Sequence, residues 1–230
     1  MLNKPAVVLL SGGVDSATAA VIAKRAGFAI HALSFRYGQR HACEIHAASR
    51  VANFLTASSH LVIDFDLRAI GGSALTDEIE VPKARSTAEI ANGIPATYVP
   101  ARNTIFLSFG LALAERIGAD DIFFGANQLD YSGYPDCREV YIRAFETMAN
   151  LATKAGVEGK THIRIHTPLL HMTKGAIIAK GIEFGVDYGL TWSCYDPRDD
   201  NLACGLCDSC QLRLKGFRDA GAVDPIAYVE

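Results

Sequence analysis

Short apolar stretches alternate with longer amphipathic stretches along most of the chain. The short stretches are rich in β-branched or aromatic residues and predict strands over residues 6–10, 29–37, 60–65, 121–125 and 162–167. The longer stretches predict helices over residues 16–26, 42–55, 103–117, 139–155 and 173–184. Glycines near the ends of these helices are typical stop signals, namely Gly27, Gly118, Gly156 and Gly185.

Strands that alternate with helices predict a parallel sheet, because each crossover helix returns the chain to the same end of the sheet. We therefore expect an α/β fold with a Rossmann-like parallel sheet of about five strands and helices on both faces. Residues 1–190 would form this domain, and residues 191–230 a small C-terminal segment packed on it. Residues 66–102 have weak periodicity and frequent glycine and proline, which predicts a lid or a partly disordered loop.

The composition limits the classes of protein to which the chain can belong. With 230 residues, 50% hydrophobic and 20% charged, it is long enough to bury one sizeable core. A net charge of −3 without a dense basic run argues against a nucleic acid or an anionic membrane as partner. The N-terminal apolar stretch is too short for a signal peptide, and no apolar run is long enough to span a bilayer. These features predict a cytoplasmic protein.

A glycine-rich loop lies between the first predicted strand and the first predicted helix. A strand-to-helix turn offers unpaired backbone N–H groups and the positive end of the helix dipole, which suit a phosphate. The two glycines let the backbone wrap phosphate oxygens, the serines can donate, and the aspartate can cap the helix or hold magnesium. The loop therefore predicts an ATP site formed by Leu10, Ser11, Gly12, Gly13, Val14, Asp15 and Ser16. The alternative is an ordinary glycine-rich turn.

Four of the six cysteines are crowded near the C-terminus, at Cys194, Cys204, Cys207 and Cys210. Four thiolates suit a tetrahedral zinc ion, and a closed four-sulfur site leaves no position for water, which favours a structural metal. Cys207 and Cys210 would share a face at the start of a helix over residues 208–219. An iron–sulfur cluster is the rival, since C-x2-C-x2-C also opens the ferredoxin pattern, although the C-x3-C-P continuation is absent. Unmetallated thiols are a third possibility.

Polar residues also follow other predicted strands. Residues 130–138 combine carboxylates and aromatic rings that can hold a flat polar ring, although the segment can also be a rigid turn in which Asp136 caps the following helix. Arg102 heads a helix and can grip a phosphate or carboxylate bidentately, or simply be solvated. Lys174 opens another helix, where a cation is disfavoured unless an anion is nearby, so it is a candidate phosphate ligand. Cys137 is a candidate nucleophile, but a lone cysteine is more often inert packing.

The loop at residues 11–16 resembles the PP-loop of the ATP pyrophosphatase superfamily, whose members adenylate a substrate oxygen and release pyrophosphate. Six motifs in order extend the resemblance over nearly the whole chain. They are this loop, residues 37–41, 99–103 and 132–138, residues 167–169 with Lys174, and the four-cysteine motif. In this combination the chain resembles the 7-cyano-7-deazaguanine synthase family of queuosine precursor biosynthesis, with an adenine nucleotide alpha-hydrolase-like fold.

The resemblance implies a ligase that forms carbon–nitrogen bonds. Its substrates would be 7-carboxy-7-deazaguanine, ammonia and ATP, with Mg²⁺ and Zn²⁺ as cofactors, and it would be a homodimer without a direct nucleic-acid partner. The implied catalytic residues are Asp15, Ser16, Lys174 and Arg102. The implied substrate-binding residues are Tyr37, Gln39, Arg40, Asn103, Asp130, Tyr131, Tyr134 and Asp136.

Three other functions fit parts of the pattern. Another amide-forming PP-loop ligase would share both the loop and the metal. A tRNA-thiolating enzyme would need an activated cysteine outside the metal site and a basic surface, and neither is evident in the sequence. The four-cysteine segment can also be a zinc module that binds nucleic acid, with the α/β part acting as a nucleotide sensor.

Overall fold

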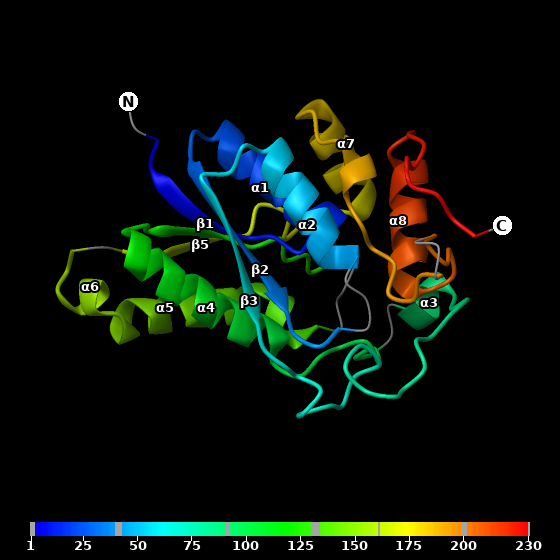
Figure 1. Cartoon of the computed structure of the whole chain (residues 1–230), viewed down its shortest axis with the longest axis horizontal. Coiled ribbons are helices and arrows are strands. Elements are labelled where there is room, and N and C mark those ends of the chain that lie inside the picture. Colours follow the sequence, from blue (N-terminus) through cyan, green and yellow to red (C-terminus); the bar gives the residue numbers. More distant parts are fainter. Residues whose placement is uncertain are drawn as a thin grey trace.

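In the computed structural model, residues 3–39, 43–90, 93–129, 134–160, 162–198 and 202–229 are described. A five-stranded sheet with the order β3-β2-β1-β4-β5 forms its centre, and every pairing is parallel (Figure 1). The strands are β1 (Pro5–Leu9), β2 (Ala29–Arg36), β3 (Ser59–Asp64), β4 (Asp121–Phe123) and β5 (Arg164–His166). The predicted α/β fold with a parallel sheet is confirmed, and each strand overlaps its predicted range.

The register of β1 explains where a ligand site arises. Val8 pairs with Ala32 of β2 on one side and with Phe123 of β4 on the other. The chain winds from β1 to β3 in one direction and then crosses to the opposite side for β4 and β5. The switch point therefore lies between β1 and β4, which is where open α/β sheets bind their ligands.

Both faces of the sheet are covered by helices, as predicted. The helices that contact the strands are α1 (Val14–Arg25), α2 (Cys43–Phe54), α4 (Arg102–Ile117) and α5 (Glu139–Ala152). Helix α7 (Lys174–Glu183) packs on α1, and α8 (Asp208–Asp219) packs on α7. Ala6 and Val8 pack with residues of α1 and α2 on one face, whereas Val7 and Leu9 pack with residues of α4 and α5 on the other (Figure 1). Because side chains alternate along a strand, an apolar β1 serves both cores.

The predicted helix over residues 139–155 is wrong at its C-terminal end. Helix α5 stops at Ala152, because Thr153 adopts an extended backbone with φ −102° and ψ 146°. The Thr153 hydroxyl accepts a hydrogen bond from the Gly156 N–H at 3.3 Å and caps a new short helix, α6 (Lys154–Val157). Gly156 therefore lies inside α6 rather than ending α5. A threonine that caps competes with the helix pattern on which the prediction relied.

The segment at 66–102 is packed more closely than its weak periodicity indicated. Leu67, Leu75 and Val99 are buried in the main core, and Ala74 and Val81 pack with the cysteine cluster. Among its described residues, the short helix α3 (Thr87–Ile90) was not predicted. The short 3₁₀ turns Pro135–Cys137 and Tyr188–Leu190 were not predicted either.

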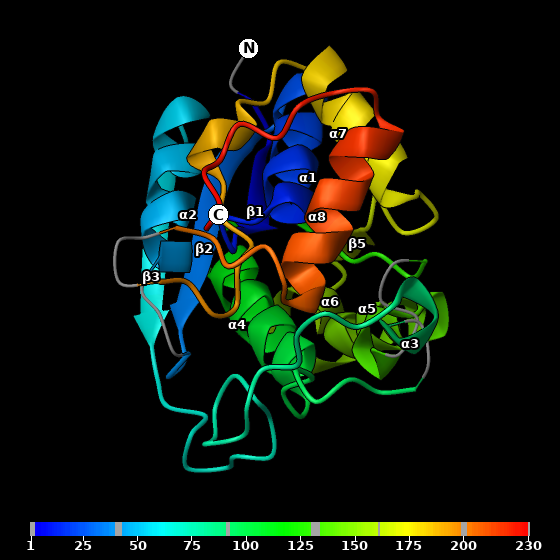
Figure 2. The ribbon, with the colours of Figure 1, turned by 90° about the vertical axis from the view of Figure 1, so that its right-hand side faces the viewer.

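Helices α7 and α8 join the C-terminal segment to the α/β domain (Figure 2). A Cβ atom built on Gly175 would lie 2.7 Å from Asp219 Cβ, so the two helices approach within a distance that only glycine allows. Among the described residues, no helix is long and apolar enough to cross a membrane.

Candidate active site

A cavity of about 200 Å³ lies at the carboxyl ends of β1, β2 and β4. One part of its wall consists of the glycine-rich loop, the end of β4 and Lys174. A second part holds aromatic and charged side chains from β2, α2 and α4, and a third part comes from the C-terminal segment. The described residues thus bring the loop, Arg102 and Lys174 together in one cavity.

The glycine-rich loop is held in a wrapped conformation by its own serines. The Ser11 N–H and hydroxyl both donate to the Ser16 hydroxyl, at 3.2 and 3.0 Å, and that hydroxyl donates to the Gly13 carbonyl at 3.1 Å. Helix α1 begins directly after Gly13, so its first N–H groups face the cavity side of the loop. The arrangement suits a pyrophosphate, whose oxygens can accept from these groups.

Gly12 is required by both conformation and space. Its φ of +84° lies in the left-handed region, and a Cβ atom there would lie 2.5 Å from the Ala48 nitrogen and 2.6 Å from the Glu44 carbonyl oxygen. The Gly12 carbonyl accepts a hydrogen bond from the Trp192 N–H at 2.9 Å. The loop is therefore fixed between helix α2 and the C-terminal segment.

Asp15 and Lys174 form the central ion pair of the site. The Lys174 ammonium donates to both carboxylate oxygens of Asp15, at 2.7 and 2.8 Å, although 159 residues separate them. Thr173 caps α7 by accepting from the Ala176 N–H, so Lys174 occupies the first position of that helix. The Asp15 carboxylate is thus an anion beside Lys174, and both side chains line the cavity. The role of Lys174 as a phosphate ligand stays a prediction.

Arg102 points its guanidinium into the second part of the cavity. It donates to the Tyr37 hydroxyl at 3.2 Å and lies 5.9 Å from the centroids of the Tyr37 and Phe106 rings. Burial raises the pKa of Tyr37 to about 12, so this hydroxyl stays neutral. Directly before Arg102, Ala101 adopts a left-handed backbone with φ +53°, which costs a non-glycine residue about 1–2 kcal/mol. The strained residue, Ala101, lies directly before the first residue of α4.

Asp136 caps a different helix from the one predicted. Its Oδ2 accepts from the Asn103 N–H at 3.1 Å, at the start of α4 rather than α5, because the 3₁₀ turn at Pro135–Cys137 directs the carboxylate toward α4. Its Oδ1 is buried without a hydrogen-bond partner among the described residues. The Asn103 side-chain amide lies 3.3 Å from the Cys137 sulfur. Asp136 and Asn103 thus support the cavity wall.

Cys137 lines the cavity but is a poor nucleophile. Burial raises the pKa of its thiol to about 12, with the Asp136 carboxylate adding to the effect. A thiol with this pKa carries almost no thiolate near neutral pH. The chemistry therefore favours the interpretation of Cys137 as packing.

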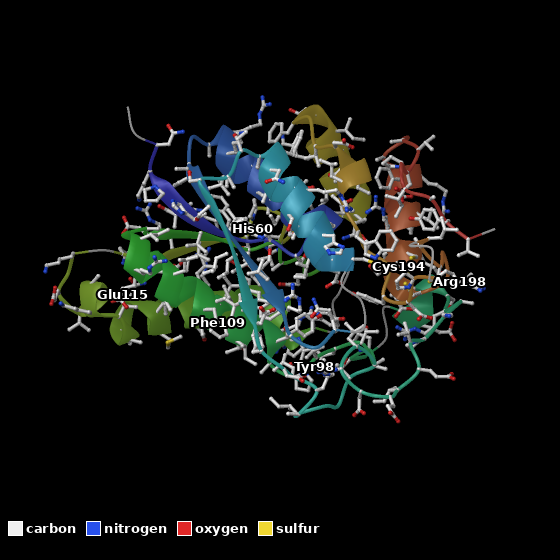
Figure 3. All side chains as sticks on the ribbon, in the orientation of Figure 1. His60, Tyr98, Phe109, Glu115, Cys194 and Arg198 are labelled. Atoms are coloured by element: carbon white, nitrogen blue, oxygen red, sulfur yellow. The ribbon has the colours of Figure 1, made fainter. Side chains whose placement is uncertain are left out.

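The remaining substrate-binding candidates are placed unequally. Tyr134 is buried and lines the cavity, with its ring centroid 5.6 Å from that of Tyr98, which is labelled in Figure 3. The Gln39 amide instead bonds to backbone, accepting from the Tyr37 N–H and donating to the Phe35 carbonyl. The other three, Arg40, Asp130 and Tyr131, lie outside the described residues.

The four cysteines converge in space. The sulfur atoms of Cys194, Cys204, Cys207 and Cys210 all lie within 4.8 Å of one another. A tetrahedral zinc–sulfur site has sulfur atoms about 3.8 Å apart, so this set fits such an ion. The N–H groups of Asp196 and Cys204 approach the Cys194 sulfur at 3.4 and 3.2 Å, as expected for donors that stabilise a thiolate. Thiol donation from Cys194 and Cys210 also lowers the pKa of Cys207. The four cysteines can therefore hold a metal.

The C-terminal segment builds part of the cavity itself, which the sequence did not indicate. Trp192, Ser193, Tyr195, Ser209 and Arg213 all line it. In Figure 3, Cys194 lies at the end of the molecule that α8 occupies. The cysteine cluster is thus close to the cavity along the chain, because Cys194 is only two residues from Trp192.

Glu44 and Phe106 are further cavity residues that the sequence reasoning missed. Phe106 follows Arg102 by four residues on α4, and this spacing places both on one helix face. Glu44 lies in the first turn of α2 and carries no local signal of a ligand site. It reaches the cavity only because α2 packs on Gly12.

A parallel sheet with a glycine-rich loop at its switch point defines an α/β protein with an adenine nucleotide alpha-hydrolase-like fold. The chain belongs to the family described as Queuosine biosynthesis protein QueC, whose model matches residues 5–221.

Similar proteins agree with this family. The 7-cyano-7-deazaguanine synthase of Paramagnetospirillum magneticum is 64% identical over 225 residues, covering 98% of this chain and 99% of the relative. That of Geotalea uraniireducens is 63% identical over 229 residues, covering 100% of this chain and 99% of the relative. The solved structure of NMN synthetase from Francisella tularensis has a TM-score of 0.50 at 16% identity, covering 96% of this chain and 78% of that one. This last likeness concerns the fold alone.

Proposed function

We propose that the chain is a 7-cyano-7-deazaguanine synthase, which converts 7-carboxy-7-deazaguanine, ammonia and ATP to the nitrile in queuosine precursor biosynthesis. The names of its relatives support this function. The observation that carries it is one cavity that joins a pyrophosphate cradle to a pocket of aromatic and charged side chains. Such a cavity can hold a phosphate chain and a flat heteroaromatic acid together.

The first half of the reaction forms an amide. A carboxylate oxygen of the acid attacks the α-phosphorus of ATP, pyrophosphate leaves, and an acyl adenylate results. Ammonia then attacks the acyl carbon and AMP leaves. The N–H groups at the start of α1 and the Ser11 and Ser16 hydroxyls would receive the leaving pyrophosphate, and Lys174 and Arg102 would stabilise the charge that develops on it.

The second half removes the remaining oxygen. The amide oxygen attacks the α-phosphorus of another ATP, because hydroxide is a poor leaving group and AMP is a good one. Loss of AMP and a proton from the adenylated amide then forms the carbon–nitrogen triple bond. The same cradle would serve both adenylations, since each releases pyrophosphate from the same bond of ATP.

Magnesium and zinc would have different roles. A single carboxylate beside substrate phosphates is a typical magnesium site, and Asp15 offers this arrangement in the cavity. Magnesium held there would neutralise charge on the pyrophosphate. A zinc ion on Cys194, Cys204, Cys207 and Cys210 would be structural, since four sulfur ligands leave no position for water.

The resemblance also supports a homodimer in the cytoplasm, with small molecules rather than nucleic acid as partners. An exposed apolar stripe on α5 is consistent with a subunit contact, since Val140, Met148 and Leu151 are 70%, 40% and 74% exposed. The spacing of these residues places them along one side of the helix.

The direct test of the function is product formation. The protein is incubated with ATP, magnesium, ammonium and 7-carboxy-7-deazaguanine, and the product is identified by mass. We expect the nitrile, formed only when both ATP and ammonium are present. An unchanged acid, or an amide that accumulates without nitrile, would overturn the proposal.

A further inference from the structure

One acidic side chain in the cavity has no role in the chemistry described above. Glu44 lies in the first turn of α2, is half-buried, and lines the cavity beside the aromatic wall. In the part of the chain that the structure describes, its carboxylate makes no hydrogen bond and no ion pair. Taking an ionised carboxylate out of water without a partner costs free energy, so a ligand that supplies donors is the expected compensation.

The surroundings of Glu44 suit a flat ring. Phe106 stacks on Phe35 with centroids 4.1 Å apart and an interplanar angle of 14°, and Tyr37 packs against Phe106 at 5.5 Å. Such paired rings form a rigid face on which a heteroaromatic ring can lie. The guanidinium of Arg102 donates to the Tyr37 hydroxyl and not to Glu44, and its positive charge acts on the Glu44 carboxylate only through space and lowers the pKa of that carboxyl group.

The chemistry of a carboxylate selects between the two ring systems in the proposed reaction. An ionised carboxylate only accepts hydrogen bonds, so its two oxygens match two adjacent N–H donors. A guanine-like ring offers such a pair, at N1–H and the 2-amino group. The matching edge of adenine offers one donor and one acceptor, and would leave an acceptor facing a carboxylate.

We propose that Glu44 is the residue that recognises the deazaguanine ring, by accepting hydrogen bonds from N1–H and the 2-amino group. This inference rests on the proposed function. Of the two carboxylates that the sequence singled out for this role, Asp136 is less suited because it caps α4. Asp130 lies outside the described residues. Glu44 thus determines which heterocyclic acid is activated.

The position of Glu44 also relates the ring to the phosphate cradle. The carbonyl oxygen of Glu44 lies 2.6 Å from the point where a Cβ of Gly12 would be, so the first turn of α2 touches the loop directly. A ring anchored at its pyrimidine edge has its 7-carboxyl group on the opposite side. The loop and Lys174 line the same cavity as Glu44.

Binding measurements without turnover test the assignment. Trp192 is the only tryptophan and lines the cavity, so its fluorescence reports occupancy. Glu44→Gln replaces one acceptor with a donor, and Glu78→Gln is the matched control because Glu78 is exposed and does not line the cavity. We expect Glu44→Gln to weaken binding of the acid by about 10- to 100-fold, while the affinity for ATP changes less than about twofold. The control should bind both ligands as the wild type does.

A second experiment uses an analogue of the acid that lacks the 2-amino group. For the wild type, this comparison changes the ligand and leaves the protein unaltered. We expect the wild type to bind this analogue about tenfold more weakly than the acid, and Glu44→Gln to bind the two about equally. If Glu44→Gln weakens ATP but not the acid, Glu44 contacts adenine and the assignment is overturned. The assignment also fails if both proteins discriminate against the analogue to the same extent. Wild-type protein that neither binds nor converts the acid would instead contradict the proposed function.

Discussion

At the scale of single residues, the site depends on charges brought together from distant parts of the chain. Asp15 lies in the first turn of α1 and forms an ion pair with Lys174, the first residue of α7. Each was predicted from a local rule, Asp15 from the loop motif and Lys174 from its place at a helix N-terminus. Neither rule specifies the partner, because their contact depends on how α1 and α7 pack.

Substituting Asp15 with asparagine keeps the shape of the side chain and removes its charge. We expect Asp15→Asn to lower ATP–pyrophosphate exchange by about 100-fold or more, because a positioned charge at the reacting phosphate is lost. Glu183→Gln is the control, since Glu183 is 61% exposed and pairs with Lys180 on the outer side of α7. Exchange is measured with labelled pyrophosphate and stability by thermal unfolding. Full exchange in Asp15→Asn would contradict the PP-loop assignment.

Glu44 gives a prediction of how stability depends on pH. Burial raises its pKa, and the charge of Arg102 only partly opposes this effect. A carboxyl group whose pKa is raised by folding contributes stability that is fully present below its unfolded pKa of about 4.3 and is lost as pH rises through the folded value. We therefore expect Glu44→Gln to be more stable than the wild type at pH 8, and the difference to disappear near pH 4. Urea midpoints at the two pH values measure this, and a wild type that is more stable at pH 8 would refute it.

At the scale of elements, alternation of apolar and amphipathic stretches was sufficient to predict all five strands of the sheet. In β1, β2 and β4 the apolar pattern agrees with burial, whereas no residue of the edge strand β3 is fully buried. The errors arose where a side chain competes with that pattern, as Thr153 does by capping α6. The burial of Leu67, Leu75 and Val99 could not be predicted from the sequence of residues 66–102 either, because it depends on contacts with distant elements.

Helix α8 is anchored by a buried ion pair that carries a stability prediction. Arg213 forms two hydrogen bonds to Asp224, at 2.8 and 2.9 Å, and donates to the Thr191 hydroxyl, while both charged side chains are under 5% exposed. Removing one partner leaves a buried charge uncompensated, so Asp224→Ala should cost about 3–5 kcal/mol in the free energy of unfolding. Asp219→Ala, which removes an exposed ion pair on the same helix, should cost less than about 1 kcal/mol. Urea titration measures the free energy of unfolding of both variants. Equal losses would show that the buried ion pair stabilises the protein no more than the exposed one.

At the scale of the whole molecule, the C-terminal segment forms part of the wall of the cavity that also contains the glycine-rich loop. Trp192 donates from its N–H to the carbonyl of Gly12, and Tyr195 and Ser209 complete the wall. The cysteine spacing predicted a metal site, but spacing within one segment says nothing about which surface the segment covers. Loss of the metal should therefore affect the substrate cavity as well as local stability.

Cys207→Ser tests this connection. Removing one thiolate from a four-sulfur site leaves the ion under-coordinated, so we expect about one equivalent of zinc to be lost and the thermal midpoint to fall. Cys43→Ser, which changes a cysteine outside the set of four, should keep its metal. Metal analysis and thermal unfolding give the comparison. Iron with visible absorption in the wild type would support a cluster in place of zinc.

The central claim is that one site removes both oxygens of the acid through adenylation. The most direct test supplies the primary amide of the deazaguanine with ATP and magnesium but no ammonia. We predict conversion to the nitrile with about one AMP released per nitrile, since the remaining oxygen must leave attached to phosphorus. An inert amide, together with an acid that is converted only as far as the amide, would contradict the account and indicate an ordinary amide ligase.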